Sequence, residues 1–184
     1  MKANALKQAS FISLFAFGAS ASLLANEMEL SINEELIDLR LTTEYQQDFA
    51  GQFAAMHSDF DNLGSNQLSY EFYTQDEVEG FDVKLGAKGF WLDSEDDNGF
   101  GIALGLGASR DLTQRISAGV SLYYSPDIIT GGDFNSVFEI DARLTFQLLE
   151  NGALFFGHRS YEADNGSVDV DIYDDAYFGI KFEF

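Results

Sequence analysis

The side chains in this sequence that could support catalysis are few, and they centre on a histidine and a serine two positions apart. His158 and Ser160 would point to the same face of a β-strand, and Glu162 would share that face. A serine beside a histidine base and a carboxylate is the arrangement used in nucleophilic acyl transfer. Lone His-x-Ser pairs occur in many strands without a catalytic role, so we favour a plain strand histidine here.

The second histidine, His57, stands close to Asp59 and Asp61, which could form the rim of a hydrolase site of the aspartate and histidine type. The chain has 2 histidines and no cysteine, which leaves few ways to build a triad and excludes a thiolate metal site. The acidic run at residues 93–98 is no EF-hand loop, because Asn98 stands where the sixth position must be glycine. We therefore expect no enzyme activity, no cofactor and no metal site.

The elements that must position these side chains follow an N-terminal leader. Lys2 and Lys7 precede an apolar run, from Ala9 to about Leu24, that small residues interrupt. This pattern is typical of a secretory signal peptide, so we expect a leader at residues 1–25 and one domain at residues 26–184. Beyond the leader no apolar run is long enough for a membrane-spanning helix. The net charge of -21 argues against binding nucleic acid.

After the leader, apolar and polar residues alternate with a period of two along almost the whole chain. In the clearest segment, GFGIALGLGASRDL, the residues Phe100, Ile102, Leu104 and Leu106 interleave with glycines that no helix would tolerate. We count about ten such strands, or about eight if the weak first hairpin is left out. The sequence thus predicts an all-β fold, an up-and-down antiparallel transmembrane β-barrel.

The connections between the predicted strands alternate in length. Those after residues 58, 92, 125 and 163 are longer and rich in Asp, Asn and Gly, whereas residues 111–114 and 149–152 form tight turns. Long loops at one end and short turns at the other are typical of bacterial outer-membrane barrels, in which the short turns are periplasmic. An even number of strands also places both termini at the short-turn end.

The volume of the lumen decides which face of each strand points outward. A barrel of eight to ten strands has an interior that side chains fill, so the Gly, Ser and Thr set fits inside and the Phe, Leu and Ile set faces lipid. Aromatic residues near the strand ends would form interfacial girdles; they are Trp91, Tyr70, Tyr73, Tyr123, Tyr124 and Tyr177. The charged residues on the inner face are Asp82, Lys84, Lys88, Glu139, Asp141, Arg143, Lys181 and Glu183. We favour an ion-pair plug for this set, with the selectivity ring of a small pore as the alternative.

The last strand of the sequence carries a further signal. Phe178, Ile180, Phe182 and Phe184 alternate with polar or small residues in DDAYFGIKFEF, which resembles the closing strand of bacterial outer-membrane barrels. In those proteins this strand is the signal that the barrel-insertion machinery reads. The segments GFGIALGLGASRDLTQRISAGVSLYYSPD, FEIDARLTF and YFGIKFEF together resemble the YfaZ-type outer-membrane proteins over about residues 80–184.

The resemblance implies a bacterial outer-membrane location, with outer-membrane lipid, lipopolysaccharide and the insertion machinery as partners, and it implies no catalytic residue. We expect a monomeric barrel of structural or narrow-pore type. One alternative is an outer-membrane enzyme that acts on lipid A through His158 and Ser160, although Tyr161 follows the serine where such deacylases have an asparagine. The other alternative is a soluble, lipocalin-like barrel.

Overall fold

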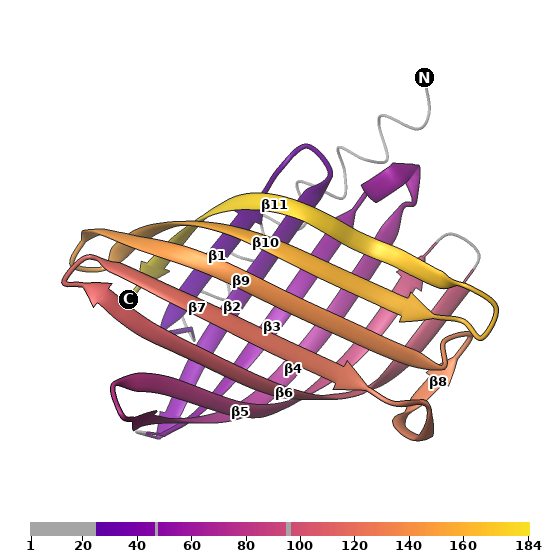
Figure 1. The fold of residues 1–184 in the computed structure, drawn as a ribbon, viewed down its shortest axis with the longest axis horizontal. Coiled ribbons are helices and arrows are strands. Elements are labelled where there is room, and N and C mark those ends of the chain that lie inside the picture. The colour runs from indigo at the N-terminus through magenta and orange to yellow at the C-terminus, as the bar shows by residue number, and fades with distance from the viewer. Residues whose placement is uncertain (1–24, 47, 95–96) are drawn as a thin grey trace.

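The structure is a computed structural model in which almost every described residue belongs to a strand (Figure 1). It describes residues 25–46, 48–94 and 97–184, so the predicted signal peptide lies outside the described residues except for Ala25. The strands are β1 (Glu27–Ile32), β2 (Leu36–Gln46), β3 (Phe49–Ser58), β4 (Ser65–Val78), β5 (Phe81–Ser94), β6 (Asp97–Thr113), β7 (Ile116–Ser125), β8 (Thr130–Gly132), β9 (Ser136–Leu149), β10 (Gly152–Asp164) and β11 (Asp169–Glu183). Two 3-10 turns, η1 (Phe60–Asn62) and η2 (Asp127–Ile129), interrupt the loops.

The strands close into a barrel in which each strand is antiparallel to its neighbours. β1 pairs with β11, with Leu30 opposite Ile180, and β5 pairs with β6, so the sheet has no free edge. Ten strands form this wall, while the short β8 pairs with β6 alone beyond the end of β7. The prediction of a ten-stranded up-and-down barrel is therefore confirmed. The eight-stranded alternative is wrong, because β1 and β2 form a regular hairpin within the wall.

The two ends of the barrel differ in their connections. The turns are tight at the end of the barrel where β1 begins, at Glu27. For example, Glu79 and Gly80, which both have positive φ, join β4 to β5 directly. At the other end lie the η1 loop and the η2–β8 loop. We call these the short-turn end and the loop end. The long loop expected after residue 92 is not found, because β5 and β6 stay paired as far as Ser94 and Asp97.

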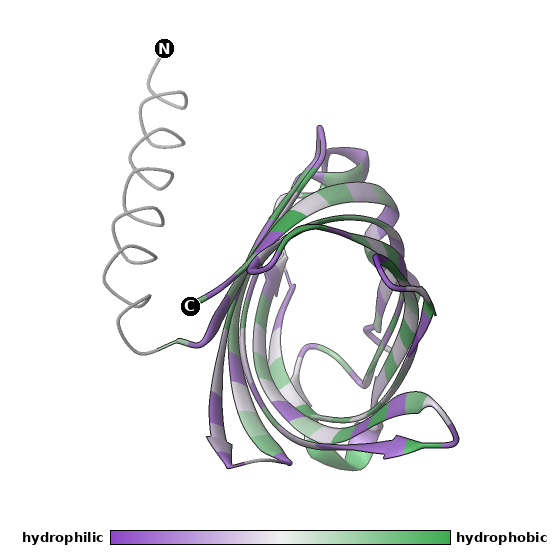
Figure 2. Cartoon of the chain, turned by 90° about the vertical axis from the view of Figure 1, so that its left-hand side faces the viewer, coloured by the Kyte–Doolittle hydropathy of each residue, from purple (hydrophilic) through white to green (hydrophobic). Residues whose placement is uncertain are grey.

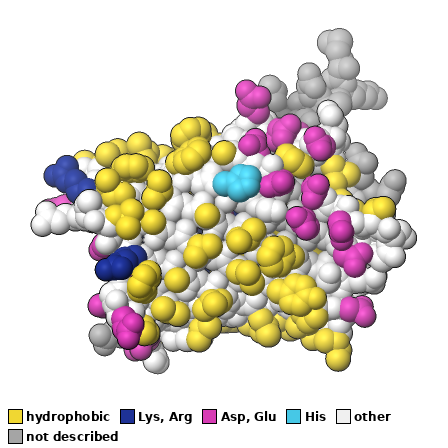
Figure 3. Space-filling model, viewed as in Figure 1, with side chains coloured by type: hydrophobic (Ala, Val, Ile, Leu, Met, Phe, Trp, Pro, Cys, Tyr) yellow, Lys and Arg dark blue, Asp and Glu magenta, His cyan; other side chains and the backbone are white. Residues whose placement is uncertain are grey.

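The large apolar side chains point outward from the wall and the small and charged ones point inward. Phe100, Leu104 and Phe178 are 62%, 60% and 64% exposed, and apolar side chains cover the middle of the outer face (Figure 3). The polar and apolar bands that alternate along each strand are visible in Figure 2. A closed sheet with an apolar exterior is the form in which strands cross a bilayer. The soluble, lipocalin-like alternative is therefore wrong.

Charge is also distributed unevenly between the two ends. Acidic side chains gather at the loop end of the face shown in Figure 3, and basic ones appear at its short-turn end. Arg110 and Arg115, at the short-turn end, are exposed. The other basic residues of the described chain point into the lumen. No helix among residues 25–46, 48–94 and 97–184 is long and apolar enough to cross a membrane.

Only three of the six aromatic residues predicted for the interfacial girdles lie on the outer face of the barrel. Tyr70, Trp91 and Tyr124 lie on the outer face, where they are 36%, 43% and 47% exposed. The prediction is wrong for three others, which are buried inside the barrel at 9% exposed or less: Tyr73, Tyr123 and Tyr177. Their position in the alternation places them on the lumen face, where their rings and hydroxyl groups contact charged side chains.

Candidate functional site: the barrel lumen

Arg159 on β10 lies at the centre of the lumen and links three strands. Its Nη1 donates to Asp38 Oδ2 on β2 at 2.8 Å, and its Nε donates to Asp141 Oδ2 on the neighbouring β9 at 3.0 Å. Arg159 is 2% exposed and Asp38 is 1% exposed, so bulk water does not reach this contact. A charge buried to this extent needs a paired partner of opposite sign to offset its lost hydration.

Two further cations join the same cluster. Arg40 on β2 donates from Nε to Asp38 Oδ2 at 2.9 Å, and its Nη2 lies 3.8 Å from Glu139 Oε1. Lys88 on β5 pairs with Glu139 across the lumen. The Tyr177 hydroxyl, also inside, donates to Asp141 Oδ2 at 2.6 Å. We call the six charged members of this cluster the ion-pair belt: Asp38, Arg40, Lys88, Glu139, Asp141 and Arg159.

A second group of ion pairs surrounds Glu71 on β4. Lys84 Nζ donates to Glu71 Oε2 at 2.8 Å, and the Tyr123 hydroxyl lies 2.9 and 3.0 Å from the two carboxylate oxygens. The Lys84 ammonium lies 3.9 Å from the centre of the Tyr73 ring, and the Lys88 ammonium lies 4.1 Å from that of Tyr123. The tyrosines therefore connect the Glu71 group to the belt through cation–π contacts.

Nearer the short-turn end, two more basic side chains are paired. Arg143 on β9 donates from Nη1 to both carboxylate oxygens of Glu29 on β1, at 3.0 Å each. Lys181 lies 2.6 Å from Glu27 and 3.1 Å from Glu183. Every basic side chain that the described residues place inside the lumen thus has at least one carboxylate partner, which offsets the desolvation of both groups.

The loop end of the lumen is filled by apolar side chains. We call these the apolar plug: Leu36, Leu92, Phe134, Val137, Tyr161, Ile172 and Tyr173, each at most 4% exposed. Tyr173 also packs edge-on against Phe60 of η1, with ring centroids 5.9 Å apart. Gln67 on β4 donates to the Tyr161 hydroxyl on β10 at 2.9 Å, so this layer is tied across the lumen as well.

The short-turn end of the lumen is lined by small residues and is partly open. We call it the vestibule, and its residues are Ser109, Ser117, Gly119 and Thr145, all half-buried. Along the barrel axis the lumen therefore passes from the vestibule through the ion-pair belt to the apolar plug.

The residues predicted to form the lumen charge set are mostly found in these ion pairs. Lys84, Lys88, Glu139, Asp141, Arg143, Lys181 and Glu183 all have a partner of opposite charge inside the barrel or at its mouth. Asp82 is exposed near the start of β5 and lies outside these pairs. The predicted set lacks the partners on the first strands, Glu27, Glu29, Asp38, Arg40 and Glu71, although the same alternation marks them as inward.

Arg159, the central residue of the belt, is also missing from the predicted set. The run Leu154-Phe155-Phe156 obscures the alternation at the start of β10. In the structure Phe155 is 3% exposed and points inward, whereas Leu154 and Phe156 are 45% and 42% exposed. Continuing the alternation from Phe155 places Arg159 inside, and this is the signal in the sequence that identifies it.

The histidine pairs considered for catalysis lie on the outer face of the barrel. His158 Nε2 is 3.2 Å from Asp174 Oδ1, and Ser160 Oγ donates to Glu162 at 3.3 Å. His158 therefore pairs with an aspartate of β11, and within the described chain no hydrogen bond joins it to Ser160. His57 Nδ1 lies 3.0 Å from the Asn66 side-chain oxygen. No group of three or more His, Asp or Glu side chains among the described residues could hold a metal ion.

The closed wall, the apolar exterior and the paired charges inside define a bacterial outer-membrane β-barrel of structural or narrow-pore type. Residues 3–184 match the family model described as "YfaZ precursor". The chain belongs to the YfaZ family. This membership confirms the resemblance seen in the sequence, and the word precursor agrees with a chain that is made with a leader.

The solved structures to which the chain is similar include two porins and one outer-membrane channel, each with a TM-score below 0.5. The KdgM porin is 9% identical, with 86% of this chain and 98% of that chain covered and a TM-score of 0.49. The NanC porin is 11% identical, with 86% of this chain and 98% of that chain covered and a TM-score of 0.49. The channel DcaP of Acinetobacter baumannii is 10% identical, with 85% of this chain and 54% of that chain covered and a TM-score of 0.42. A comparison with curated proteins finds no match.

Proposed function

We propose that this protein is a sealed structural barrel of the outer membrane, which passes no solute while its ion pairs are intact. The observation that carries the proposal is the burial of the ion-pair belt. Arg159, Asp38, Glu139 and Asp141 are each at most 5% exposed and are bonded to one another from different strands. In a conducting filter, charged side chains line a hydrated path and stay accessible to the passing ion.

Opening the belt would require breaking buried ion pairs. Removing one partner of such a pair costs about 3–5 kcal/mol, because the remaining charge is left without compensation. The cross-lumen contacts also hold strands that are distant in the chain, such as β2 and β10. The belt therefore supports the wall from inside, which is a structural role that needs no ligand and no catalytic group.

The test is a planar-bilayer recording of the purified protein. We expect no discrete conductance steps from the natural protein. The charge-neutral double variant Arg159→Ala/Asp38→Ala removes both members of the central pair and should show small steps. The matched control is Arg110→Ala/Asp111→Ala, which removes two exposed residues of opposite charge at the short-turn end and should stay silent. Heat-modifiability on gels checks that each variant is folded.

A narrow pore is the second candidate, and the vestibule favours it. Half-buried Ser117 and Thr145 leave the short-turn end of the lumen accessible, as expected of half of a channel. Conductance steps from the natural protein would establish this function and overturn the sealed barrel. An enzyme that acts on lipid A would instead remove an acyl chain, and we expect the lipid A mass spectrum of cells to be unchanged when the protein is expressed.

A further inference from the structure

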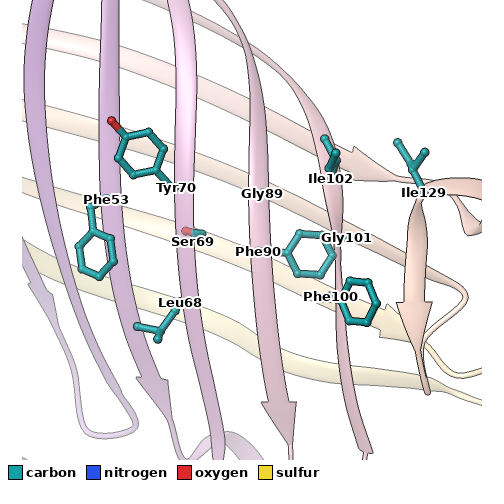
Figure 4. Close-up of a pocket in the computed structure, with 10 residues that line it drawn as sticks. All are labelled: Phe53, Leu68, Ser69, Tyr70, Gly89, Phe90, Phe100, Gly101, Ile102 and Ile129. Carbon is teal, nitrogen blue, oxygen red and sulfur yellow. The ribbon is translucent and has the colours of Figure 1, made fainter.

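The outer face of the barrel has a groove of about 660 Å³ that runs across β5 (Figure 4). Its floor includes Gly89, and its walls include Leu68 and Tyr70 of β4 and Phe100 and Ile102 of β6. Gly89 is directly opposite Tyr70 on one side and Ile102 on the other. The groove therefore arises because the middle of three adjacent strands lacks a side chain where both neighbours carry large ones.

The empty space above Gly89 is not required by the packing of the wall. A Cβ atom at Gly89 would meet no heavy atom closer than the Tyr70 carbonyl oxygen, at 3.9 Å. Gly51, another glycine of the outer face, is different, because a Cβ there would overlap the Tyr70 hydroxyl and lie 2.9 Å from the Tyr45 ring. A neighbouring side chain thus explains the glycine at position 51, whereas none among the described residues fills the space at position 89.

The rim of the groove at the loop end is apolar and is braced by hydrogen bonds. Ile129 of η2 lines the groove, and Ile128 beside it is 89% exposed. The Thr130 hydroxyl donates to the carbonyl oxygens of Ser125 and Pro126, at 3.2 and 3.0 Å, which fixes the base of this turn. β8 then continues along β6, so the turn projects from the wall next to the groove (Figure 1).

We propose that this groove seats one acyl chain of a bilayer lipid from the leaflet next to the loops. The groove is continuous with the lipid-facing band, because Phe100 and Ile102 in its wall are 62% and 50% exposed to the surroundings of the barrel. The Tyr70 hydroxyl is turned toward Tyr45, with 2.6 Å between the two oxygens, so it is engaged outside the groove. Within a membrane, such binding rests on close packing against the chain and not on expulsion of water.

The test uses the single tryptophan of the chain as a reporter. Trp91 lies in register between Leu68 and Phe100, two residues that line the groove. The full protein is reconstituted in phosphatidylcholine vesicles that contain a small fraction of phosphatidylcholine with dibrominated acyl chains. Bromine quenches tryptophan fluorescence at short range. The dependence of quenching on the mole fraction of brominated lipid gives the number of lipid chains within range of Trp91, and we expect this number to include the chain seated in the groove.

The variant Gly89→Leu fills the groove and should lower the number of chains within range of Trp91 by about one, because the seated chain is lost. Ala142→Leu adds the same bulk to an exposed position of the outer face on β9 and should quench as the natural protein does. The same number of chains around Trp91 in the natural protein and in Gly89→Leu overturns the proposal, and Gly89→Ala takes the place of Gly89→Leu in this comparison if that variant does not fold. A dimer in native mass spectra that Gly89→Leu abolishes also overturns it, because the occupant would then be a second copy of the chain.

Discussion

Arg159 on β10 and Asp38 on β2 meet across the lumen at 2.8 Å although 121 positions separate them in the chain. The contact joins the two halves of the sequence through the interior, independently of the hydrogen bonds of the wall. Arg159 also bonds to Asp141 on its neighbouring strand, so one side chain links β10 to both β9 and β2. We therefore expect the stability of the barrel to depend strongly on this arginine.

Replacing Arg159 by alanine should lower the free energy of unfolding by about 3–5 kcal/mol, because buried Asp38 and Asp141 lose their main cation. The measurement is urea unfolding in lipid vesicles, followed by Trp91 fluorescence. Arg159→Ala/Asp38→Ala should be less destabilising than the sum of the two single variants by about 1–3 kcal/mol. Additive effects would show that the two side chains do not interact.

Tyr123 points into the lumen and the adjacent Tyr124 points outward, so the same substitution can be compared on the two faces of β7. Tyr123→Phe removes the hydroxyl that bonds to the buried Glu71 carboxylate and should cost about 1.5–3 kcal/mol, the range for hydrogen bonds to charged groups. Tyr124→Phe changes an outward-facing residue and should alter stability by less than about 0.5 kcal/mol. Equal effects of the two substitutions in the same unfolding assay would contradict the inward assignment of Tyr123.

The two outer-face glycines should respond to alanine in opposite directions. Gly51→Ala brings a methyl group against Tyr70 and Tyr45 and should destabilise the barrel by about 1 kcal/mol. Gly89→Ala meets open space and should stabilise it by about 0.5 kcal/mol, since glycine in a strand is less favourable than alanine. Unfolding midpoints of the two variants in lipid-free detergent check this; a shared sign would contradict the difference in space above the two glycines.

A charge on the outer face should be penalised according to its depth in the membrane. Leu104→Arg places a cation on the middle of β6 and should cost about 2–4 kcal/mol. Leu112→Arg, on the same strand beside the short-turn end, should cost only about 0–1 kcal/mol. Both leucines are well exposed, at 60% and 58%, so burial within the protein does not distinguish them. Equal costs in vesicles would contradict a membrane-spanning position for Leu104.

We also propose that β11 carries the insertion signal. Phe178, Ile180 and Phe182 lie on its outer face, and Phe184 follows at 66% exposed. Phe182→Ser together with Phe184→Ser should reduce the amount of heat-modifiable barrel in membranes, while unassisted refolding into detergent stays close to normal. Leu154→Ser, on the outer face of β10, is the control. An equal loss in both assays would indicate a general folding defect in place of a lost recognition signal.

The strands of the wall can be predicted from the sequence because the alternation of apolar and polar residues is a local property of each strand. Glycine or alanine at every second position from Gly99 to Gly107 and the large apolar residues between them suffice to identify a strand with two unlike faces. The same rule, applied to the amino-acid sequence alone, marks Glu29, Asp38 and Glu71 as inward. Strand ends are harder to predict, since Asp93 and Asp97 would suit a long loop equally well and yet lie in the paired ends of β5 and β6.

Pairing across the lumen could not be predicted in the same way. Which inward cation meets which carboxylate depends on the stagger of the strands around the barrel, and this stagger is a property of the closed wall. Lys88 and Glu139, for example, lie on strands that are not neighbours. The inward tyrosines show a related limit: Tyr123 and Tyr124 are the same residue type, and only their place in the alternation separates a lumen residue from a lipid-facing one.

The seam between β1 and β11 brings the first and last strands of the wall together. Such an arrangement has high contact order, so its formation is slow and comes after most local hairpins. The links from β10 to β2 and from β9 to β1 can form only once that seam is in place. Maturation of the interior should therefore be a late, cooperative event, and a barrel arrested before it would leave the carboxylates and cations of the lumen unmatched.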